Sequence, residues 1–338
     1  MPEALGFAVV IFGGLIHGSF AFPMKRIEGR WSWENIWLVY SIVGLAILPP
    51  LLALSTVPAL GRIYSSTPIS TIALIALFGV GWGAGSVLFG QAISRVGMAL
   101  GFAIILGITS TLGSLMPLIV LHPEDLWTPR GRTLLAGLAI AVTGIIVCAK
   151  AGAMRDRDSR GGDSTAIRGS FAAGLTISIL SGILSPMLNF GFVVGEPLQA
   201  AAREMGARSS LASNAIWAPA LLGGFLVNAG YAVYLLNKNR TWGLYSGARP
   251  QPFDWIGCAI MGLFWFGGIS IYGMGAASLG RLGPVAGWPV FMSTVIITAN
   301  VLGFLSGEWR DARLSARVTE WAGIAFLVAA ILVVSRVS

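Results

Sequence analysis

One histidine lies within an otherwise apolar segment near the start of the chain. His17 falls about two-thirds of the way along the apolar residues 4–24. A charged side chain inside a bilayer costs roughly 2.5–3.5 kcal/mol on insertion scales, and an imidazole titrates close to physiological pH. His17 is therefore the candidate proton-coupling residue. The alternative is a neutral imidazole that is hydrogen-bonded to a backbone carbonyl group.

Uncharged polar and aromatic side chains recur in the other apolar segments, and such groups bind neutral polar solutes through hydrogen bonds and ring faces. The candidates for substrate binding are Trp82, Gln91, Ser110, Thr111, Asn189, Trp265, Tyr272, Trp288, Ser293 and Thr294. Further residues of the same kinds are Trp37, Asn214, Trp217, Asn228 and Asn300. Each has a structural alternative, because Ser and Thr bond back to their own helix, and Asn and Gln join neighbouring helices.

The elements that must position these side chains are membrane-spanning helices. Hydrophobic residues make up 55% of the chain and charged residues 11%, whereas soluble proteins carry roughly 25% charged residues. Runs of about 20 apolar residues are long enough to cross a bilayer as helices. They occupy residues 4–24, 35–54, 69–94, 98–121, 133–149, 169–194, 213–236, 255–277, 284–305 and 319–334. The expected fold is an all-α integral membrane protein with ten transmembrane helices in the lipid bilayer.

The chain contains an internal repeat. At a fixed offset of 183 residues, the stretch 77–111 matches 261–294: Trp82 falls on Trp265, Gly97 on Gly280, and Ser110-Thr111 on Ser293-Thr294. The division expected is a first five-helix repeat at 1–150, a polar linker at 151–168 and a second five-helix repeat at 169–338. Because five is odd, the two copies enter the membrane from opposite sides and form inverted repeats, an architecture typical of transporters.

Prolines and glycines indicate where the helices bend and pack closely. Pro23 and Pro186 are repeat partners late in the first and within the sixth apolar segment, and each removes a backbone hydrogen bond, so both are candidate hinges. Glycines at every second position from Gly79 to Gly85 lie on two sides of the third helix and allow close helix approach. Residues 196–208 are an insertion that could form a short amphipathic surface helix.

The net charge of +8 does not indicate nucleic-acid binding, because the basic residues are spread over short connectors between apolar segments. If the two ends of the chain are outside, most of the 22 lysines and arginines fall in connectors on the inner side of the membrane. Basic residues are enriched in cytoplasmic loops. This distribution favours both termini outside.

The ordered set of motifs resembles a known family. These motifs are Pro23-x-Lys25-Arg26, Trp31-Ser-Trp-Glu34, the run from Leu77 through Trp82-Gly83-x-Gly85, residues 196–206, and Glu308-Trp309. Over nearly the whole chain they are similar to the L-rhamnose/proton symporter family of the drug/metabolite transporter superfamily. The chain departs from the pattern at 283–288, where no carboxylate is present.

The resemblance implies a secondary active transporter of the bacterial inner (plasma) membrane. It would import a neutral sugar, L-rhamnose or a similar deoxyhexose, by proton symport with alternating access. The alternative within the superfamily is an exporter of metabolites or drugs. Export of cations is disfavoured because the superfamily's small multidrug members use a carboxylate in the middle of the first helix, where this chain has His17.

Other classes of protein have little support in the sequence. An enzyme would need a nucleophile, a metal cluster or paired carboxylates within the segments, but the chain has two histidines and no HExxH or GxSxG motif. Both cysteines, Cys148 and Cys258, lie in apolar runs, which supports neither a disulfide nor a thiolate metal site. No cofactor is therefore expected. A passive channel remains the alternative to active transport.

Overall fold

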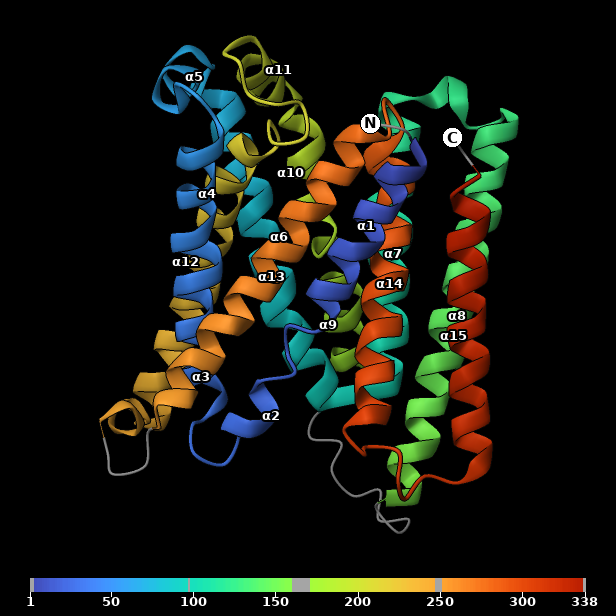
Figure 1. Cartoon of the computed structure of the whole chain (residues 1–338). Coiled ribbons are helices and arrows are strands. Elements are labelled where there is room, and N and C mark those ends of the chain that lie inside the picture. Colours follow the sequence, from blue (N-terminus) through green and yellow to red (C-terminus); the bar gives the residue numbers. More distant parts are fainter. Residues whose placement is uncertain (1–2, 97, 160–170, 247–250, 337–338) are drawn as a thin grey trace.

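The computed structural model describes residues 3–96, 98–159, 171–246 and 251–336, and all regular elements in this part of the chain are helices (Figure 1). Within the described residues, nine helical segments are long and apolar enough to cross a membrane. They are Trp33–Thr56, Ile69–Ile93, Leu100–Leu121, Pro129–Arg157, Ala172–Glu204, Asn214–Asn239, Pro252–Ser278, Gly283–Leu305 and Leu314–Val334. A tenth apolar helix, Ala4–Gly18, is shorter. The prediction of an all-helical membrane protein is confirmed.

The individual elements follow the apolar runs closely. They are α1 (Glu3–Gly18), α2 (Met24–Ile27), α3 (Trp33–Ser41), the π-helical η1 (Ile42–Ile47), α4 (Leu48–Thr56), α5 (Leu60–Ser66), α6 (Ile69–Val96), α7 (Met98–Leu121), η2 (Pro123–Asp125), α8 (Pro129–Ser159), α9 (Phe171–Leu184), α10 (Met187–Val194), α11 (Glu196–Glu204), α12 (Asn214–Asn239), η3 (Trp242–Tyr245), α13 (Pro252–Ser278), α14 (Gly283–Leu305) and α15 (Leu314–Val334). Gly97 of the repeat match, residues 160–168 of the predicted linker and residues 169–170 of the predicted second repeat lie outside the described residues.

The first helix is shorter than predicted. It ends at Gly18, and Pro23 lies beyond it as the residue that precedes α2, so the placement of Pro23 late in the first helix is wrong. Turns with bonds from Ser19 N to Ile16 O and from Phe22 N to Ser19 O replace the helix. Because proline has no N–H to continue the helical ladder, the helix cannot run unbroken through Pro23 into α2.

The linker begins later than predicted, because α8 continues through Ser159. Ala151 and Met154 of this extension pack against Trp309, Ala312 and Ala316. The polarity of the stretch suggested a loop, but burial of its apolar side chains against the start of α15 keeps it helical.

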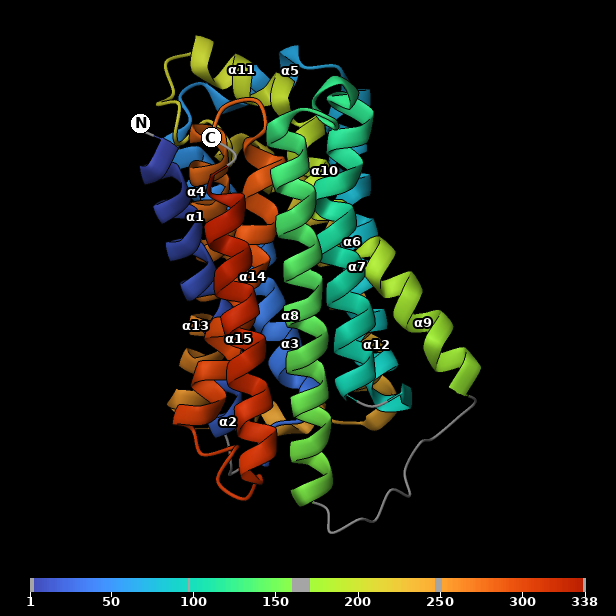
Figure 2. The same ribbon diagram turned by 90° about the vertical axis from the view of Figure 1, so that its right-hand side faces the viewer.

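The sixth apolar segment is interrupted where a proline was noted. Pro186 separates α9 from α10, and α9 slants away from the bundle below this break (Figure 2). The insertion that follows forms α11, whose Leu198 and Ala202 are buried while Arg203 is exposed. The prediction of a short amphipathic helix is confirmed.

Glycines on α6 determine how closely it packs on its two neighbours. A Cβ atom on Gly79 would lie 1.7 Å from the carbonyl oxygen of Ala220 on α12. One on Gly85 would lie 2.8 Å from the backbone nitrogen of Ser185, at the break between α9 and α10. Alternate glycines therefore face opposite partners, as the spacing predicted.

The molecule has two ends with different charge. The N- and C-termini, α5 and α11 lie at one end, which we call the terminal end; α2 and the connection between α14 and α15 lie at the other, which we call the basic end (Figure 1). Its cationic residues include Lys25, Arg26, Arg30, Arg155, Arg310, Arg313 and Arg317. The structure thus groups these basic residues, which lie in separate connectors of the sequence, at one end of the molecule (Figure 1).

Candidate functional site

Two cavities lie at different depths in the bundle. The first, of about 610 Å³, runs from Trp82 and Trp265 in the middle of α6 and α13 to Arg155 and Trp309 at the basic end; we call it the basic-end cavity. The second, of about 720 Å³, lies at the terminal end among His122, Arg203 and Arg281; we call it the terminal-end cavity. Both volumes are within the range of roughly 300–1,000 Å³ that is common for small-molecule sites.

Aromatic rings form one wall of the basic-end cavity. The ring centroids of Trp82 and Trp265 lie 4.8 Å apart, and those of Trp37 and Tyr40 are also 4.8 Å apart. All four line the cavity. The structure thus brings together the two tryptophans that the internal repeat paired. Glycines allow this: a Cβ on Gly224 of α12 would lie 2.6 Å from the ring of Trp82.

Uncharged polar groups lie beside these rings. Ser86 on α6 donates to the Asn228 side-chain oxygen at 2.8 Å, and the indole nitrogen of Trp37 donates to the same oxygen at 2.9 Å. Ser185, at the break before α10, and Asn300 on α14 also line the cavity. The cavity lining therefore combines ring faces with hydroxyl and amide groups, the kinds of group that bind a neutral polyol.

A buried hydrogen-bonded layer separates the two cavities. We call Asn189, Tyr272 and Trp288 the separating layer. The Tyr272 hydroxyl donates to the Asn189 side-chain oxygen at 2.5 Å, and the Asn189 amide donates to the carbonyl oxygen of Gly113 at 2.8 Å. The Trp288 indole donates to the carbonyl oxygen of Thr109 at 3.1 Å. All three side chains are at most 4% exposed, so this level of the bundle is tightly packed, and none of the three residues lines either cavity.

The order of residues along three helices places the layer between the cavities. In each helix, the layer residue stands between one that lines the basic-end cavity and one that lines the terminal-end cavity. The triplets are Ser185, Asn189 and Phe192 before and in α10; Trp265, Tyr272 and Ala276 in α13; and Met292, Trp288 and Pro284 in α14. Three predicted binding residues thus lie between the two cavities and do not line either of them.

The remaining polar candidates do not line either cavity. Thr111 and Thr294 donate to the carbonyl oxygens of Gly107 and Val290 in their own helices, each at 2.8 Å. Ser110 and Ser293 are buried between helices, and Gln91 lies next to the cavity-lining Gly90 without lining the cavity itself. The hydroxyl groups of the two threonines therefore have partners within their own helices, which is the structural alternative considered for them.

His17 lies in the last turn of α1, where it contacts α13. Its Nδ1 atom lies 2.9 Å from the carbonyl oxygen of Trp265, and because that oxygen can only accept, Nδ1 carries the proton and donates. The ring packs against Trp265 and Phe291 at centroid distances of 5.2 and 5.1 Å. This arrangement matches the structural alternative considered for His17; the role in proton coupling stays a prediction.

The structure adds an ionisable residue that we did not select from the sequence. Glu320 on α15 lines the basic-end cavity and is 1% exposed. Because α15 begins at Leu314 and not near residue 319, Glu320 lies well inside the helix. A signal was present: Ala316, Glu320, Gly323 and Leu327 share the buried face of α15 at helical spacing. Glu320 is thus part of the packing stripe and not of the polar end.

Ion pairs lie at the basic end, beside the cavity-lining residue Arg155. Glu308 pairs with Lys25 and, at 3.1 Å, with Arg155, whose guanidinium also lies over the ring of Trp309 at 5.1 Å. Arg30 makes bidentate bonds to Asp254, from Nη2 to Oδ1 at 2.5 Å and from Nε to Oδ2 at 3.1 Å, although the Asp254 side chain is fully buried. These pairs join the start of the first half to the second half and to α8.

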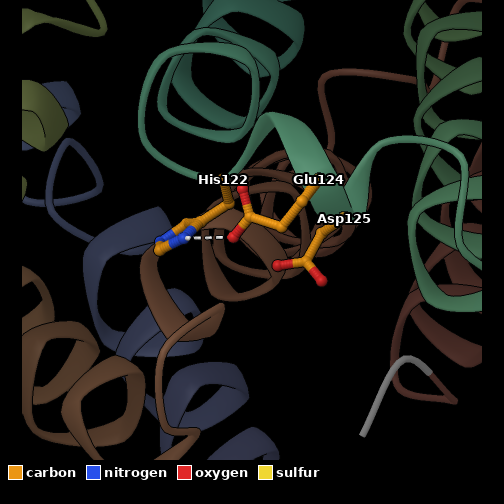
Figure 3. A group of neighbouring side chains, drawn as sticks. All are labelled: His122, Glu124 and Asp125. Atoms are coloured by element: carbon orange, nitrogen blue, oxygen red, sulfur yellow. Dashed lines mark ion pairs between the residues drawn. The ribbon is translucent and has the colours of Figure 1, made fainter.

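A second charged cluster lies at the terminal end, between α7 and α8 (Figure 3). Ligand atoms of His122, Glu124 and Asp125 lie within 4.8 Å of one another, which is a spacing that could suit a metal ion. Arg281, however, contacts Glu124 and Asp125 at 2.6 Å each. The Glu124 carboxylate accepts one hydrogen bond from its own backbone N–H and another from the Arg281 guanidinium. Both hydrogen bonds lower the pKa of Glu124. The cluster is thus an ion-pair bridge to the turn before α14.

Comparisons with known proteins cover nearly the whole chain. The family model described as L-rhamnose-proton symport protein matches residues 3–337. An L-rhamnose-proton symporter of Escherichia coli O17:K52:H18 (strain UMN026 / ExPEC) is 28% identical over 327 residues, which are 95% of this chain and 94% of the relative. One of Yersinia pestis (strain Pestoides F) is 27% identical over 312 residues, which are 90% of each chain. The matched range includes both cavities.

Proposed function

Because the chain belongs to the L-rhamnose-proton symport protein family, we propose that it imports L-rhamnose, or a similar neutral deoxyhexose, together with protons. The observation that carries the proposal is the basic-end cavity. Its volume suits a small sugar, and it combines the faces of Trp82 and Trp265 with the neutral polar groups of Ser185 and Asn300. The less polar face of a deoxyhexose packs on the rings while its hydroxyl groups bond to the polar side.

The bundle is organised as two inverted repeats, at 1–150 and 169–338, with the connecting stretch 151–168 between them. Two features support this. Proposed partner helices run in opposite directions, for example α6 against α13 and α8 against α15 (Figures 1 and 2). The packing partners also correspond: α1 packs on α13 and α14, and α9 packs on α6 and α7. In transporters with inverted repeats, one repeat moves against the other around the binding site, so that the site opens alternately to each side of the membrane.

The conformation described is open toward the basic end and closed by the separating layer. Basic residues favour the cytoplasmic side of a membrane, so the basic end faces the cytoplasm and both termini face outward. The Escherichia coli and Yersinia origin of the relatives supports the bacterial inner membrane as the location of this multi-pass chain. Opening to the outside would require Asn189, Tyr272 and Trp288 to part, while the helix ends around the basic-end cavity come together. Breaks at Pro23 and Pro186 are the proposed hinges.

The family is one of transporters, so the chain is a transporter and not an enzyme. Within the superfamily, the alternative is export of metabolites or drugs. Membership of a symporter family favours import. The direction of net movement under an imposed pH gradient distinguishes the two.

Uptake of radiolabelled L-rhamnose into proteoliposomes tests the proposal. With an acidic exterior and an alkaline interior, we expect accumulation above the external concentration, and without the gradient only equilibration. Trp265→Ala removes a wall of the cavity, so we expect at least a tenfold rise in the sugar concentration needed for half-maximal uptake. Trp127→Ala, at a site 74% exposed, is the matched control and should leave uptake unchanged. Equal accumulation of L-rhamnose with and without the pH gradient would refute proton symport.

A further inference from the structure

The proton site of a symporter must satisfy three conditions. It must be reachable from the solute cavity, it must hold a group that can take up and release a proton, and its surroundings must respond to the change in charge. Within the described residues, three carboxyl groups are buried: Glu34, Asp254 and Glu320. Buried ionisable groups inside spanning helices are costly and are functional candidates for that reason.

Two of these carboxylates already have their full set of partners. Glu34 accepts hydrogen bonds from Asn239 and Thr241 at 3.0 and 2.8 Å. Asp254 is paired with Arg30 and also accepts the backbone N–H of Gln251 at 2.8 Å, which caps α13. Both hold helices together at the basic end and do not line the cavity.

Glu320 differs from both. Its side chain lines the basic-end cavity, and its Oε1 atom has no hydrogen-bond partner among the described residues. No ion pair to Glu320 occurs among them either, although the charge of Arg155 on α8 acts on it. A buried carboxylate oxygen without a donor is unfavourable when ionised, and a bound proton removes that penalty.

The position of Glu320 follows from the packing of α15 on α8. A Cβ on Gly323, one turn further along, would lie 2.5 Å from the sulfur of Cys148. This close approach sets the Cys148 thiol beside the Glu320 carboxyl group and the Asn300 amide, and all three line the cavity. The other neighbouring helix, α14, carries no acidic or basic residue. The charged groups that respond to Glu320 are therefore those of α8, above all Arg155.

We propose that Glu320 is the residue that binds the coupled proton. The assignment rests on the proposed symport. Protonated, Glu320 is neutral and Arg155 remains with Glu308, the arrangement described here. When the proton leaves toward the basic end, the Glu320 carboxylate competes with Glu308 for the guanidinium of Arg155. Because Glu308 also pairs with Lys25, the loss of Arg155 from Glu308 changes the ion pairs that join α2, α8 and the connection between α14 and α15. Proton release from Glu320 thereby changes the contacts of Arg155, which lines the cavity at the basic end.

His17 is the competing assignment, and its geometry is less suitable. Its Nδ1 proton is held by the carbonyl oxygen of Trp265 at 2.9 Å, and the residue does not line the cavity. His17→Gln therefore belongs in the same experiment.

The test uses the full chain in proteoliposomes and two transport modes. The first is uphill accumulation of L-rhamnose driven by a pH gradient; the second is exchange of labelled for unlabelled sugar at equal pH, which needs no net proton movement. Glu320→Gln mimics the neutral side chain. We expect exchange within about twofold of the wild type, accumulation reduced to equilibration and no sugar-induced proton uptake. Glu320→Asp keeps a carboxyl group and should retain accumulation. Glu204→Gln, at an exposed site on α11, is the control.

The possible results separate the assignments. Uphill accumulation by Glu320→Gln would overturn the role of Glu320. Loss of exchange together with accumulation in this variant would also overturn it, because Glu320 would then serve sugar binding or folding. Loss of accumulation with retained exchange in His17→Gln, but not in Glu320→Gln, would assign the proton to His17. A wild-type protein that does not exchange L-rhamnose would refute the proposed function itself.

Discussion

Removal of one oxygen atom from the separating layer tests whether that layer is the closed gate. In Tyr272→Phe, the ring remains in place, but the 2.5 Å hydrogen bond to Asn189 is lost. Asn189 is 1% exposed and Tyr272 is fully buried, so water does not replace the missing donor. The Asn189 side-chain oxygen is left unsatisfied in the closed conformation alone.

The size of the effect follows from this burial. Leaving a buried acceptor without its partner costs about 1–3 kcal/mol. If the layer parts when the terminal end opens, that cost applies only to the conformation described here. The equilibrium then shifts toward the terminal-open form by a factor of about 5–150. A variant that opens this gate should still transport, because the cavity wall is unchanged.

The native thiol of Cys148 reports the shift. It lines the basic-end cavity with 8% of its surface exposed, whereas Cys258 is fully buried and lines neither cavity. Alkylation of Cys148 by a small maleimide should slow at least threefold in Tyr272→Phe, because the basic end is closed more of the time. Tyr64→Phe is the matched control, since its hydroxyl donates to the Ala215 carbonyl oxygen at 2.8 Å outside the layer. Equal alkylation rates in Tyr272→Phe and the wild type would refute the gate.

Two further predictions concern stability. Gly79→Ala places a methyl group 1.7 Å from the Ala220 carbonyl oxygen, so we expect about 1–3 kcal/mol of destabilisation and a lower Tm in detergent; Gly230→Ala meets no atom within 4 Å and should leave Tm unchanged or raise it. In the terminal-end cluster, the pKa of Glu124 lies below its usual value, so its stabilisation is present above pH 4.5 and is lost as the pH falls through the lowered pKa. The Tm difference between the wild type and Arg281→Ala should therefore narrow in acid; a constant difference from pH 7 to pH 3 would contradict this account.

Much of the helical framework could be predicted from hydropathy and spacing. Long apolar runs in a bilayer must satisfy their own backbone groups, so the spans around α6, α7, α12, α13 and α14 followed from the sequence with small errors at their ends. The alternate glycines of α6 and the amphipathic α11 were also predictable, because their pattern depends on helical geometry alone. The pairing of Trp82 with Trp265 followed from the internal repeat.

Tertiary packing decided the chemistry of the site. Uncharged polar residues that the sequence did not distinguish have different partners: Asn189 belongs to the separating layer, Asn300 lines the cavity, and Thr111 bonds to its own helix. Glu320 lay near a predicted helix end, yet the packing of α15 on α8 buries it beside Cys148. Hydropathy reports how much a segment prefers lipid, but it does not specify which partner each polar group meets. Those partners are set by the way distant helices approach one another, and that arrangement determines which groups reach the cavity.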